Sequence, residues 1–567
     1  MQKNNLIVAI VSALTVSIAF PGISRATGDL SKNQSQSSIQ GENELRNSNQ
    51  TFSWENPGPS SSVLHPGSAM AAGLIASPLR KIDSVVEQSI NEKVMPGAVV
   101  LIARRGTIAK QEAYGYAARY TNDQFSEMTS PMTMQTDTIF DLASVSKLFT
   151  TTAAMILYED NAFELDDPVA KYIPEFEQNG KENVTIRQLM THTSGFKPWI
   201  PLYTMGENRE ERLQIVLSQP LDNEPGETYS YSDLNMITLG ILVERLSGKR
   251  LDAFVKDTIT EPLDMSDTMY NPPENLKGRI AATEYQPWTD RGLVWGEVHD
   301  ENAWSLDGVA GHAGVFSTAK DLAIFAQMML QEGKYGGTRV LEPDTVKLLA
   351  ENQIPQFPDD THGLGWELDQ GWYMDALSGS GAMGHTGYTG TSIVVNPNNA
   401  TIAILLTNRV HPTRNTVSSN EIRREVAQLT ADAIPVAIPD KGDAWFSGYG
   451  NNRDATLITN VNLNEEATLT FNTWFRTELI NDYGVIEVSE DGTNWEPIGD
   501  KMTGNSEKWL IKTVNLPKNT TYIRFNYRTD NLINGRGWYV NNIKLTTKNG
   551  NEIPIKWGSD FWIERDY

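Results

Sequence analysis

The amino-acid sequence predicts two folded parts: an α/β domain on an antiparallel sheet with an inserted helical lobe, and a C-terminal all-β sandwich. Strand-like segments occur at both ends of the first part, at 98–117 and at 390–408, with mainly helical segments between them. This split indicates one sheet built from both ends of the domain, with the helices inserted. After residue 439, apolar and polar residues alternate in short stretches separated by Asp-Gly and Asn-Gly turns. That pattern is typical of an all-β sandwich.

Length and composition limit the possible functions. A chain of 567 residues is too long for one ordinary core, so two or three domains are expected. The net charge of −24 argues against nucleic acid and anionic membranes as partners. The absence of cysteine excludes disulfides, thiol chemistry and lipid attachment through an N-terminal cysteine.

The N-terminal residues 1–26 have the pattern of a secretory signal peptide. Lys3 precedes an apolar run from Leu6 to Phe20, and Ser-Arg-Ala follows at 24–26. An uncleaved membrane anchor is the alternative, but the run is short for a span of about 20 residues. We therefore expect cleavage, no other transmembrane segment, and a secreted, extracellular or cell-wall-associated protein.

Composition divides the rest of the chain into three segments. Residues 27–70 are rich in Ser, Asn, Gln, Gly and Pro, which predicts a disordered spacer. Residues 71–435 form the predicted α/β domain. Residues 436–567 form the predicted sandwich, which contains no histidine and is therefore expected to bind or stabilise rather than to catalyse.

The stretch 141–160 holds the strongest candidate for a nucleophile. Ser144 and Lys147 lie three residues apart at the start of an apolar helix, so they share one helix face. A serine needs a neighbouring base, and a lysine can be one if its pKa is lowered. The Ser-x-x-Lys pattern also occurs at 194–197, beside a proline, and at 317–320, where it begins a capped helix. Only Ser144 precedes a long helix that can be buried.

Three further motifs accompany Ser144. Tyr-Ser-Asp at 231–233 precedes a helix, His-Thr-Gly at 385–387 begins a strand pair, and Leu-Met-Thr-His-Thr-Ser-Gly occupies 189–195. In this order the motifs resemble the serine beta-lactamase and penicillin-binding-protein superfamily, in its class C and esterase branch. Its pattern is Ser-x-x-Lys, then Tyr-x-Asn, then Lys- or His-Thr-Gly. The resemblance covers about residues 79–434.

The resemblance implies a role for each motif. Ser144 would attack a carbonyl and form an acyl-enzyme. Lys147 and Tyr231 would share proton transfer, with the tyrosine held near phenolate character by the ammonium. The backbone N–H groups of Ser144 and Tyr388 would form the oxyanion hole. The substrate would be contacted by the side chains or backbone of Asp233, His385, Thr386 and Gly387.

Two residues depart from the family pattern. Asp233 replaces an asparagine, so a carboxylate stands where an amide donor is usual, and this would favour a protonated Lys147. His385 replaces the lysine of true beta-lactamases, so recognition of a substrate carboxylate loses a fixed charge. Both departures lower the expectation of beta-lactamase activity.

The segments Val-His-Asp-Glu-Asn-Ala at 298–303 and Gly-His-Ala-Gly at 311–314 add a second group of polar residues. A metal site built on His299 and His312 is one interpretation. We expect instead a hydrogen-bonded loop whose histidines contact substrate, because an acyl-transfer serine needs no metal. The pairing resembles a subgroup that includes N-acetylmuramyl-L-alanine amidases. His192 is expected to fix a loop by hydrogen bonds.

The C-terminal part resembles the MAM-like jelly-roll domain of immune-inhibitor-A metallopeptidases. The matching pieces are Trp-Phe-Ser-Gly at 445–448, the stretch 485–495, and the stretches 527–530 and 535–540. The resemblance implies a module for glycans, cell wall or calcium. Asp482 and Asp530 are candidate calcium ligands, although solvated surface carboxylates are the first expectation for them. No other cofactor is expected. The peptidase motif His-Glu-x-x-His is absent from the sequence.

Together these observations predict a secreted serine hydrolase that cleaves peptide, amide or ester bonds through a Ser144 acyl-enzyme. Peptidoglycan fragments are the expected substrates, for a D-Ala carboxypeptidase or a muropeptide amidase. A carboxylesterase of the same fold is the first alternative. A catalytically inactive cell-surface binding protein is the second.

Overall fold

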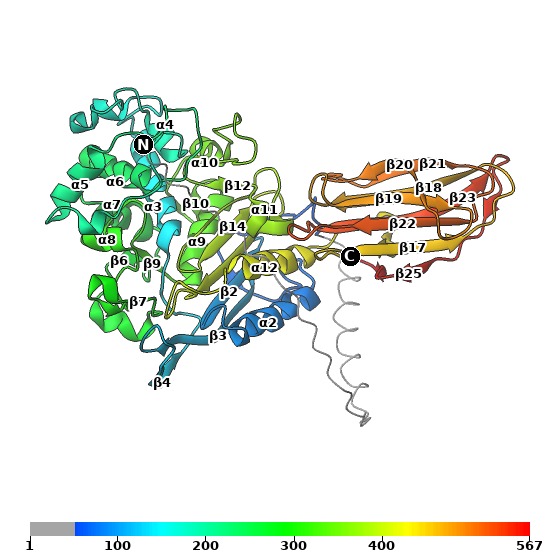
Figure 1. Ribbon diagram of the computed structural model, residues 1–567, viewed down its shortest axis with the longest axis horizontal. Helices are drawn as coiled ribbons and strands as arrows, with labels where there is room; N and C mark the ends of the chain where they lie inside the picture. Colours follow the sequence, from blue (N-terminus) through cyan, green and yellow to red (C-terminus); the bar gives the residue numbers. More distant parts are fainter. Residues whose placement is uncertain (1–51) are drawn as a thin grey trace, which may run out of the picture. The chain divides into compact units, whose positions relative to one another are not determined.

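The computed structural model describes residues 52–567 (Figure 1). The predicted signal peptide, and the predicted spacer up to residue 51, lie outside the described residues. In the described chain, no helix is both long and apolar enough to cross a membrane.

An eight-stranded sheet forms the centre of the α/β domain. Its strand order is β1-β3-β2-β15-β14-β13-β12, with β4 paired to β3. The strands are β1 (His65–Pro66), β2 (Gly97–Arg104), β3 (Thr107–Tyr120), β4 (Glu127–Thr133), β12 (Glu367–Leu368), β13 (Met383–Thr386), β14 (Ser392–Asn396) and β15 (Thr401–Thr407). β2 pairs antiparallel with β15, so strands from both ends of the domain meet in the sheet, as predicted.

The alternation of side chains in β2 explains why this strand is apolar from Ala98 to Ala103. Val99 and Leu101 belong to the apolar core on one face, and Val100 and Ile102 belong to the core on the other. Successive side chains of a strand point to opposite faces, so a sheet covered on both sides needs apolar residues at every position. The β2–β3 hairpin turns at Arg105 and Gly106, both with positive φ, as the sequence predicts.

Helices cover both faces of the sheet. α2 (Ala76–Asn91) and α12 (Asn420–Asp432) pack together on one face. α9 (Ala319–Leu330) packs on β2 and β15 from the other face. The inserted lobe contains α3 (Ser146–Glu159), α4 (Ile186–Met190), α5 (Arg209–Leu217), α6 (Asp233–Ser247), α7 (Leu251–Val255) and α8 (Glu301–Ser305).

Shorter elements complete the domain. α10 (Pro343–Ala350) and α11 (Gly371–Met374) follow α9. β5 (Phe140–Asp141), β9 (Val315–Ser317) and β6 (Met269–Tyr270) form a small sheet. β7 (Tyr285–Gln286) pairs with β8 (Gly292–Leu293), and β10 (Lys334–Tyr335) pairs with β11 (Thr338–Arg339).

Residues 52–70 differ from the predicted disordered spacer. Trp54 is buried, and its N–H donates to the carbonyl of Pro435 (2.7 Å). The buried guanidinium of Arg104 donates to the carbonyls of Ser53 (2.7 Å) and Gly73 (2.6 Å). Composition misses this order because one tryptophan and backbone carbonyls, rather than an apolar run, hold the segment.

The C-terminal part is a β-sandwich, as predicted. One sheet has the order β21-β18-β23-β16-β26, with β24 paired to β23, and the other has the order β20-β19-β22-β17-β25. Their bounds are β16 (Ala444–Phe446), β17 (Asp454–Asn460), β18 (Ala467–Arg476), β19 (Tyr483–Ser489), β20 (Glu496–Met502), β21 (Leu510–Leu516), β22 (Tyr522–Arg528), β23 (Gly537–Thr547), β24 (Glu552–Ile553), β25 (Gly558–Asp560) and β26 (Ile563–Arg565). Apolar residues of both sheets share one core, among them Phe471 and Phe525.

Candidate active site

Ser144 lies in a single 3-10 turn, η1 (Ala143–Val145), directly before α3. Ala143 has φ +47°, a conformation that costs energy for a residue other than glycine. The Asp141 carboxylate accepts from the Ala143 N–H (2.8 Å), and the Thr391 hydroxyl donates to the carbonyl of Leu142 (3.0 Å). These bonds fix the turn that carries Ser144 against the end of the β13–β14 pair.

The Lys147 ammonium lies beside Ser144, as the three-residue spacing predicts. Its Nζ is 2.9 Å from the Ser144 Oγ, 2.9 Å from the Asp233 Oδ1 and 3.3 Å from the carbonyl oxygen of His312. The lysine is 1% exposed. Three acceptors use all three of its donors.

Asp233 sets the charge of Lys147. Burial alone lowers the pKa of Lys147, but the Asp233 carboxylate and the Tyr231 hydroxyl outweigh burial and raise this pKa above its ordinary value. The lysine therefore rests as an ammonium, which agrees with the expectation from the Asp233 departure. A serine activated by a free lysine amine is not the resting arrangement.

Tyr231 shares this network. Its ring centroid is 4.7 Å from the Lys147 Nζ, and its hydroxyl interacts with both Lys147 and Ser144. Burial raises the pKa of Tyr231 above its ordinary value, although the ammonium pulls in the other direction. The expected phenolate character is therefore wrong for the resting site, because desolvation exceeds the attraction of the ammonium.

His192 fixes the loop that carries the tyrosine motif, as predicted. Its Nδ1 accepts from the Ser232 N–H (3.1 Å) and lies 3.3 Å from the Asn235 side-chain nitrogen. Burial lowers the pKa of His192 well below its ordinary value, so the ring is neutral and can accept. Ser232 immediately precedes α6, so this contact positions Tyr231 and Asp233.

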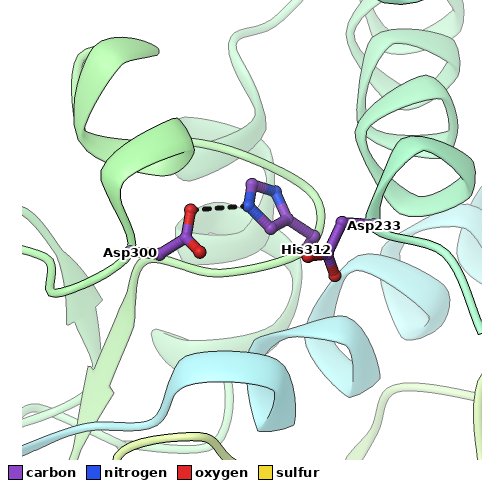
Figure 2. A group of neighbouring side chains, drawn as sticks. All are labelled: Asp233, Asp300 and His312. Atoms are coloured by element: carbon purple, nitrogen blue, oxygen red, sulfur yellow. Dashed lines mark hydrogen bonds and ion pairs between the residues drawn. The ribbon is translucent and has the colours of Figure 1, made fainter. Parts of the chain in front are cut away.

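Asp300 and His312 are hydrogen-bonded to each other near Asp233 (Figure 2), and the His312 carbonyl is the third partner of Lys147. The His312 Nε2 is 2.8 Å from the Asp300 Oδ1, and Asp300 also caps α8 by accepting from the Ala303 N–H (2.7 Å). These bonds agree with the predicted hydrogen-bonded loop. The His312 ring is 1% exposed and is not among the residues that line the cavity at Ser144.

A metal ion does not fit this group well. One ligand atom each from Asp233, Asp300 and His312 lies within 4.8 Å of the others. The Asp233 carboxylate, however, is already paired with the Lys147 ammonium at 2.9 Å. A metal cation would have to compete with that charge, so the donor set suits an internal hydrogen-bond network.

His299 packs its ring against the ring of Tyr388. Its N–H donates to the Asp141 Oδ2 (2.6 Å), its Nε2 is 2.9 Å from the Glu284 Oε2, and its ring stacks on Tyr388 with 5.8 Å between centroids. Burial disfavours the Glu284 carboxylate, but His299 and Arg414 outweigh it and lower the pKa of Glu284 to about 2. His299 is 3% exposed and lies outside the cavity lining, unlike the predicted substrate contact.

The His-Thr-Gly motif occupies the end of β13 and the following turn. Burial, with the nearby Lys147 ammonium, lowers the pKa of His385 to about 3, so it is a neutral ring without the fixed charge of a lysine. Gly387 is required here, because a Cβ would lie 2.4 Å from the carbonyl oxygen of Leu142. Tyr388 is 52% exposed over the site.

A cavity of about 350 Å³ opens at Ser144. Its lining comes from Ser144, Tyr231, Glu367, Trp372, Thr386, Gly387, Tyr388, Arg409, Ser418, Ser419, Asn420 and Arg423. Of the predicted site residues, the lining therefore includes Ser144, Tyr231, Thr386, Gly387 and Tyr388.

The charged residues of this cavity were not predicted from the sequence. Burial raises the pKa of Glu367 to about 7. The Arg423 guanidinium donates to the carbonyls of Gly387 (2.8 Å) and Thr391 (3.0 Å), so it braces the His-Thr-Gly turn. In the sequence, Arg423 lies next to the apolar positions Ile422 and Val426 of α12. An arginine on the apolar side of a helix is the pattern that could have indicated a buried charge here.

Comparisons with known proteins agree with this geometry. The profile of the Beta-lactamase family matches residues 82–428, which is more than half of the chain. The chain belongs to the beta-lactamase family. This is a family of beta-lactamase-fold serine hydrolases.

Two relatives are similar to this chain in sequence. The N-acetylmuramyl-L-alanine amidase of Bacillus subtilis (strain 168) is 33% identical over 366 residues, which are 59% of this chain and 81% of the relative. The putative D-alanyl-D-alanine carboxypeptidase of Escherichia coli (strain K12) is 33% identical over 383 residues, 62% of this chain and 86% of the relative.

A solved structure shares the fold. It is described as EstCE1, a hydrolase with promiscuous acyltransferase activity, and it aligns with a TM-score of 0.50 at 23% identity. The alignment covers 64% of this chain and all of that chain. At this identity the likeness concerns the fold alone.

Proposed function

We propose that this protein is a secreted serine hydrolase that cleaves peptide or amide bonds in peptidoglycan fragments through a Ser144 acyl-enzyme. The observation that carries the proposal is the position of the Lys147 Nζ, 2.9 Å from both the Ser144 Oγ and the Asp233 Oδ1. These three groups supply a nucleophile, a proton relay and a proton acceptor, which together can activate a serine. The names of the amidase and carboxypeptidase relatives support the substrate class.

The proton path of this proposal ends on Asp233. As the Ser144 Oγ attacks the carbonyl carbon, its proton moves to Lys147, which passes one of its own protons to the Asp233 carboxylate. The tetrahedral oxyanion is held by the N–H groups of Ser144 and Tyr388, and losing such a donor costs about 10²–10³ in rate. Return of the proton through Lys147 or Tyr231 to the leaving nitrogen releases the amine. Water then attacks the acyl-enzyme by the same path.

An ester hydrolase of the same site is the second candidate. His385 is neutral, so the site lacks the fixed cation that would bind a substrate carboxylate at that position. The missing cation would weaken the binding of a peptide with a free carboxylate more than the binding of a neutral ester. The binding-only alternative is less favoured, because Ser144, Lys147 and Tyr231 form one connected group.

Export is part of the proposal, and it rests on the residue pattern at 1–26. A muropeptide digest read by mass spectrometry tests the substrate, with the mature protein beside Ser144→Ala. Loss of a terminal alanine identifies a carboxypeptidase, and release of the whole stem peptide identifies an amidase. If the active protein yields neither product but hydrolyses small esters, the peptidoglycan proposal is wrong and the esterase candidate replaces it.

Asp233→Asn is expected to move the acidic limb of the kcat/KM pH profile to higher pH by more than about one unit, because a carboxylate ionises at much lower pH than a lysine amine. In the wild type Lys147 works as an ammonium and the Asp233 carboxylate takes the proton, whereas in the variant only a deprotonated Lys147 amine can take it. Loss of the carboxylate lowers the pKa of Lys147, but the amine still has to lose a proton that it keeps in the wild type. The maximal kcat falls, because Asp233 no longer accepts the proton.

The matched control is Asp222→Asn, since Asp222 is 52% exposed and lies 3.9 Å from Lys197 outside the site. Its pH profile should superimpose on that of the wild type. An acidic limb that stays in place in Asp233→Asn, or moves to lower pH, would contradict the proposed proton path from Lys147 to Asp233.

A further inference from the structure

Three carboxylates converge at one end of the sandwich, far in sequence from Ser144. Glu478 and Asp482 belong to the loop between β18 and β19, and Asp530 follows β22. One carboxylate oxygen of each lies within 4.8 Å of those of the other two. The Thr477 hydroxyl contacts the carbonyl of Asp482 (3.2 Å), which holds the first loop closed.

The buried carboxylate of this group lacks a full set of partners. Asp482 is 0% exposed; its Oδ1 accepts from the Asp530 N–H (3.0 Å), but its Oδ2 has no donor in the described chain. The Glu478 Oε2 is also buried without a donor. Among the described residues, no lysine or arginine forms an ion pair with the three carboxylates. A buried carboxylate oxygen without a donor is costly.

We propose that Glu478, Asp482 and Asp530 bind a calcium ion. All three ligands are oxygens, which suit a hard cation, and the group has no histidine or cysteine for zinc. The ligands come from two loops rather than one rigid element, and calcium accepts such irregular sets, whereas magnesium requires near-ideal octahedral geometry. The ion would supply the positive charge that the Asp482 Oδ2 lacks.

The proposed calcium site adjoins a loop of the sandwich that contacts the α/β domain. The loop that begins with Asp530 continues to Gly535, whose N–H donates to the Asp375 Oδ1 (3.2 Å), and to Arg536, which pairs with Asp432 (3.0 Å). Asp375 and Asp432 belong to the α/β domain. An ion that fixes Asp530 therefore also fixes the loop that contacts that domain, so calcium should slow hydrogen exchange over residues 530–536.

Thermal unfolding of the full mature chain, in EGTA and in millimolar calcium chloride, tests the site. Calcium should raise the Tm of the wild type by about 5 °C. It should do the same for Asp500→Asn, a matched control whose side chain is 90% exposed on β20. Asp482→Asn should melt at or above the wild type in EGTA, because an amide relieves the repulsion, and below it in calcium.

Two further measurements keep the test independent of how one variant folds. Isothermal titration of calcium into the wild type should give one site, and Glu478→Gln should weaken it by about tenfold or more. Magnesium chloride in place of calcium should shift the Tm less. The proposal is overturned if the wild type shows no calcium shift, or if Asp482→Asn and Glu478→Gln keep the full shift. None of these readouts uses hydrolytic activity, so the outcome does not depend on the proposed function.

Discussion

Ser144→Ala should lower turnover by at least about 10³-fold and leave the Tm nearly unchanged. The substitution removes the atom that forms the acyl-enzyme, while the hydrogen bonds from the Ala143 N–H to Asp141 and from the Thr391 hydroxyl to the Leu142 carbonyl remain. In an activated-serine site, what survives such a change comes from the oxyanion hole and substrate binding. Steady-state rates on the substrate found in the digest, together with a melting curve, measure both expectations.

Ser317→Ala is the matched control, because Ser317 belongs to a second Ser-x-x-Lys sequence in the same domain. Its hydroxyl lies 2.8 Å from that of Thr268, so its loss should cost about 1 kcal/mol of stability and little activity. If Ser144→Ala keeps its turnover, or Ser317→Ala loses as much, the nucleophile is assigned to the wrong serine.

Asp432→Asn should lower the free energy of unfolding by about 3–5 kcal/mol. The Asp432 carboxylate, 0% exposed at the end of α12, pairs with Arg536 (3.0 Å) and Arg565 (2.6 Å), and it accepts from the Tyr449 hydroxyl (3.0 Å). An amide of the same shape leaves two buried guanidinium charges without a counter-charge. Urea unfolding, followed by tryptophan fluorescence, measures the loss.

The stability of the protein should depend on pH through the same Asp432 pairing. Burial raises the pKa of Asp432, but Arg536 and Arg565 outweigh it and hold this pKa below its ordinary value. The pairing therefore stabilises the fold above the unfolded-state pKa, and this contribution is lost as pH falls through the folded-state value. Asp432→Asn should lack that part of the acid transition.

Asp166→Asn is the control for this stability prediction. Asp166 pairs with Arg187 at 2.7 Å, but its side chain is 71% exposed, and exposed pairs contribute about 0–1 kcal/mol. Equal losses of stability in the two variants would mean that burial does not strengthen the Asp432 pairing, contrary to the expectation.

The local parts of this protein follow from the sequence alone. The three-residue spacing of Ser144 and Lys147 places both groups on one helix face whatever surrounds the helix. The turn at 105–106 and the alternation in the sandwich strands likewise depend on near neighbours or on periodicity. The meeting of the two strand segments in one sheet follows instead from the order of strands and helices along the domain. The ordered motifs were enough to indicate the beta-lactamase family.

Tertiary structure decided the protonation of Tyr231, the charged lining of the cavity and the support of the site. The protonated Lys147 was expected from the Asp233 departure, and its pKa rises because Asp233, 86 residues away in sequence, reaches the ammonium. Tyr231 stays protonated because it is desolvated, and Glu367 enters the cavity from a short edge strand. The order of residues 52–70 and the pairing of Asp432 also depend on distant partners. Desolvation and Coulomb interactions act through space, so they depend on contacts that residue order does not reveal.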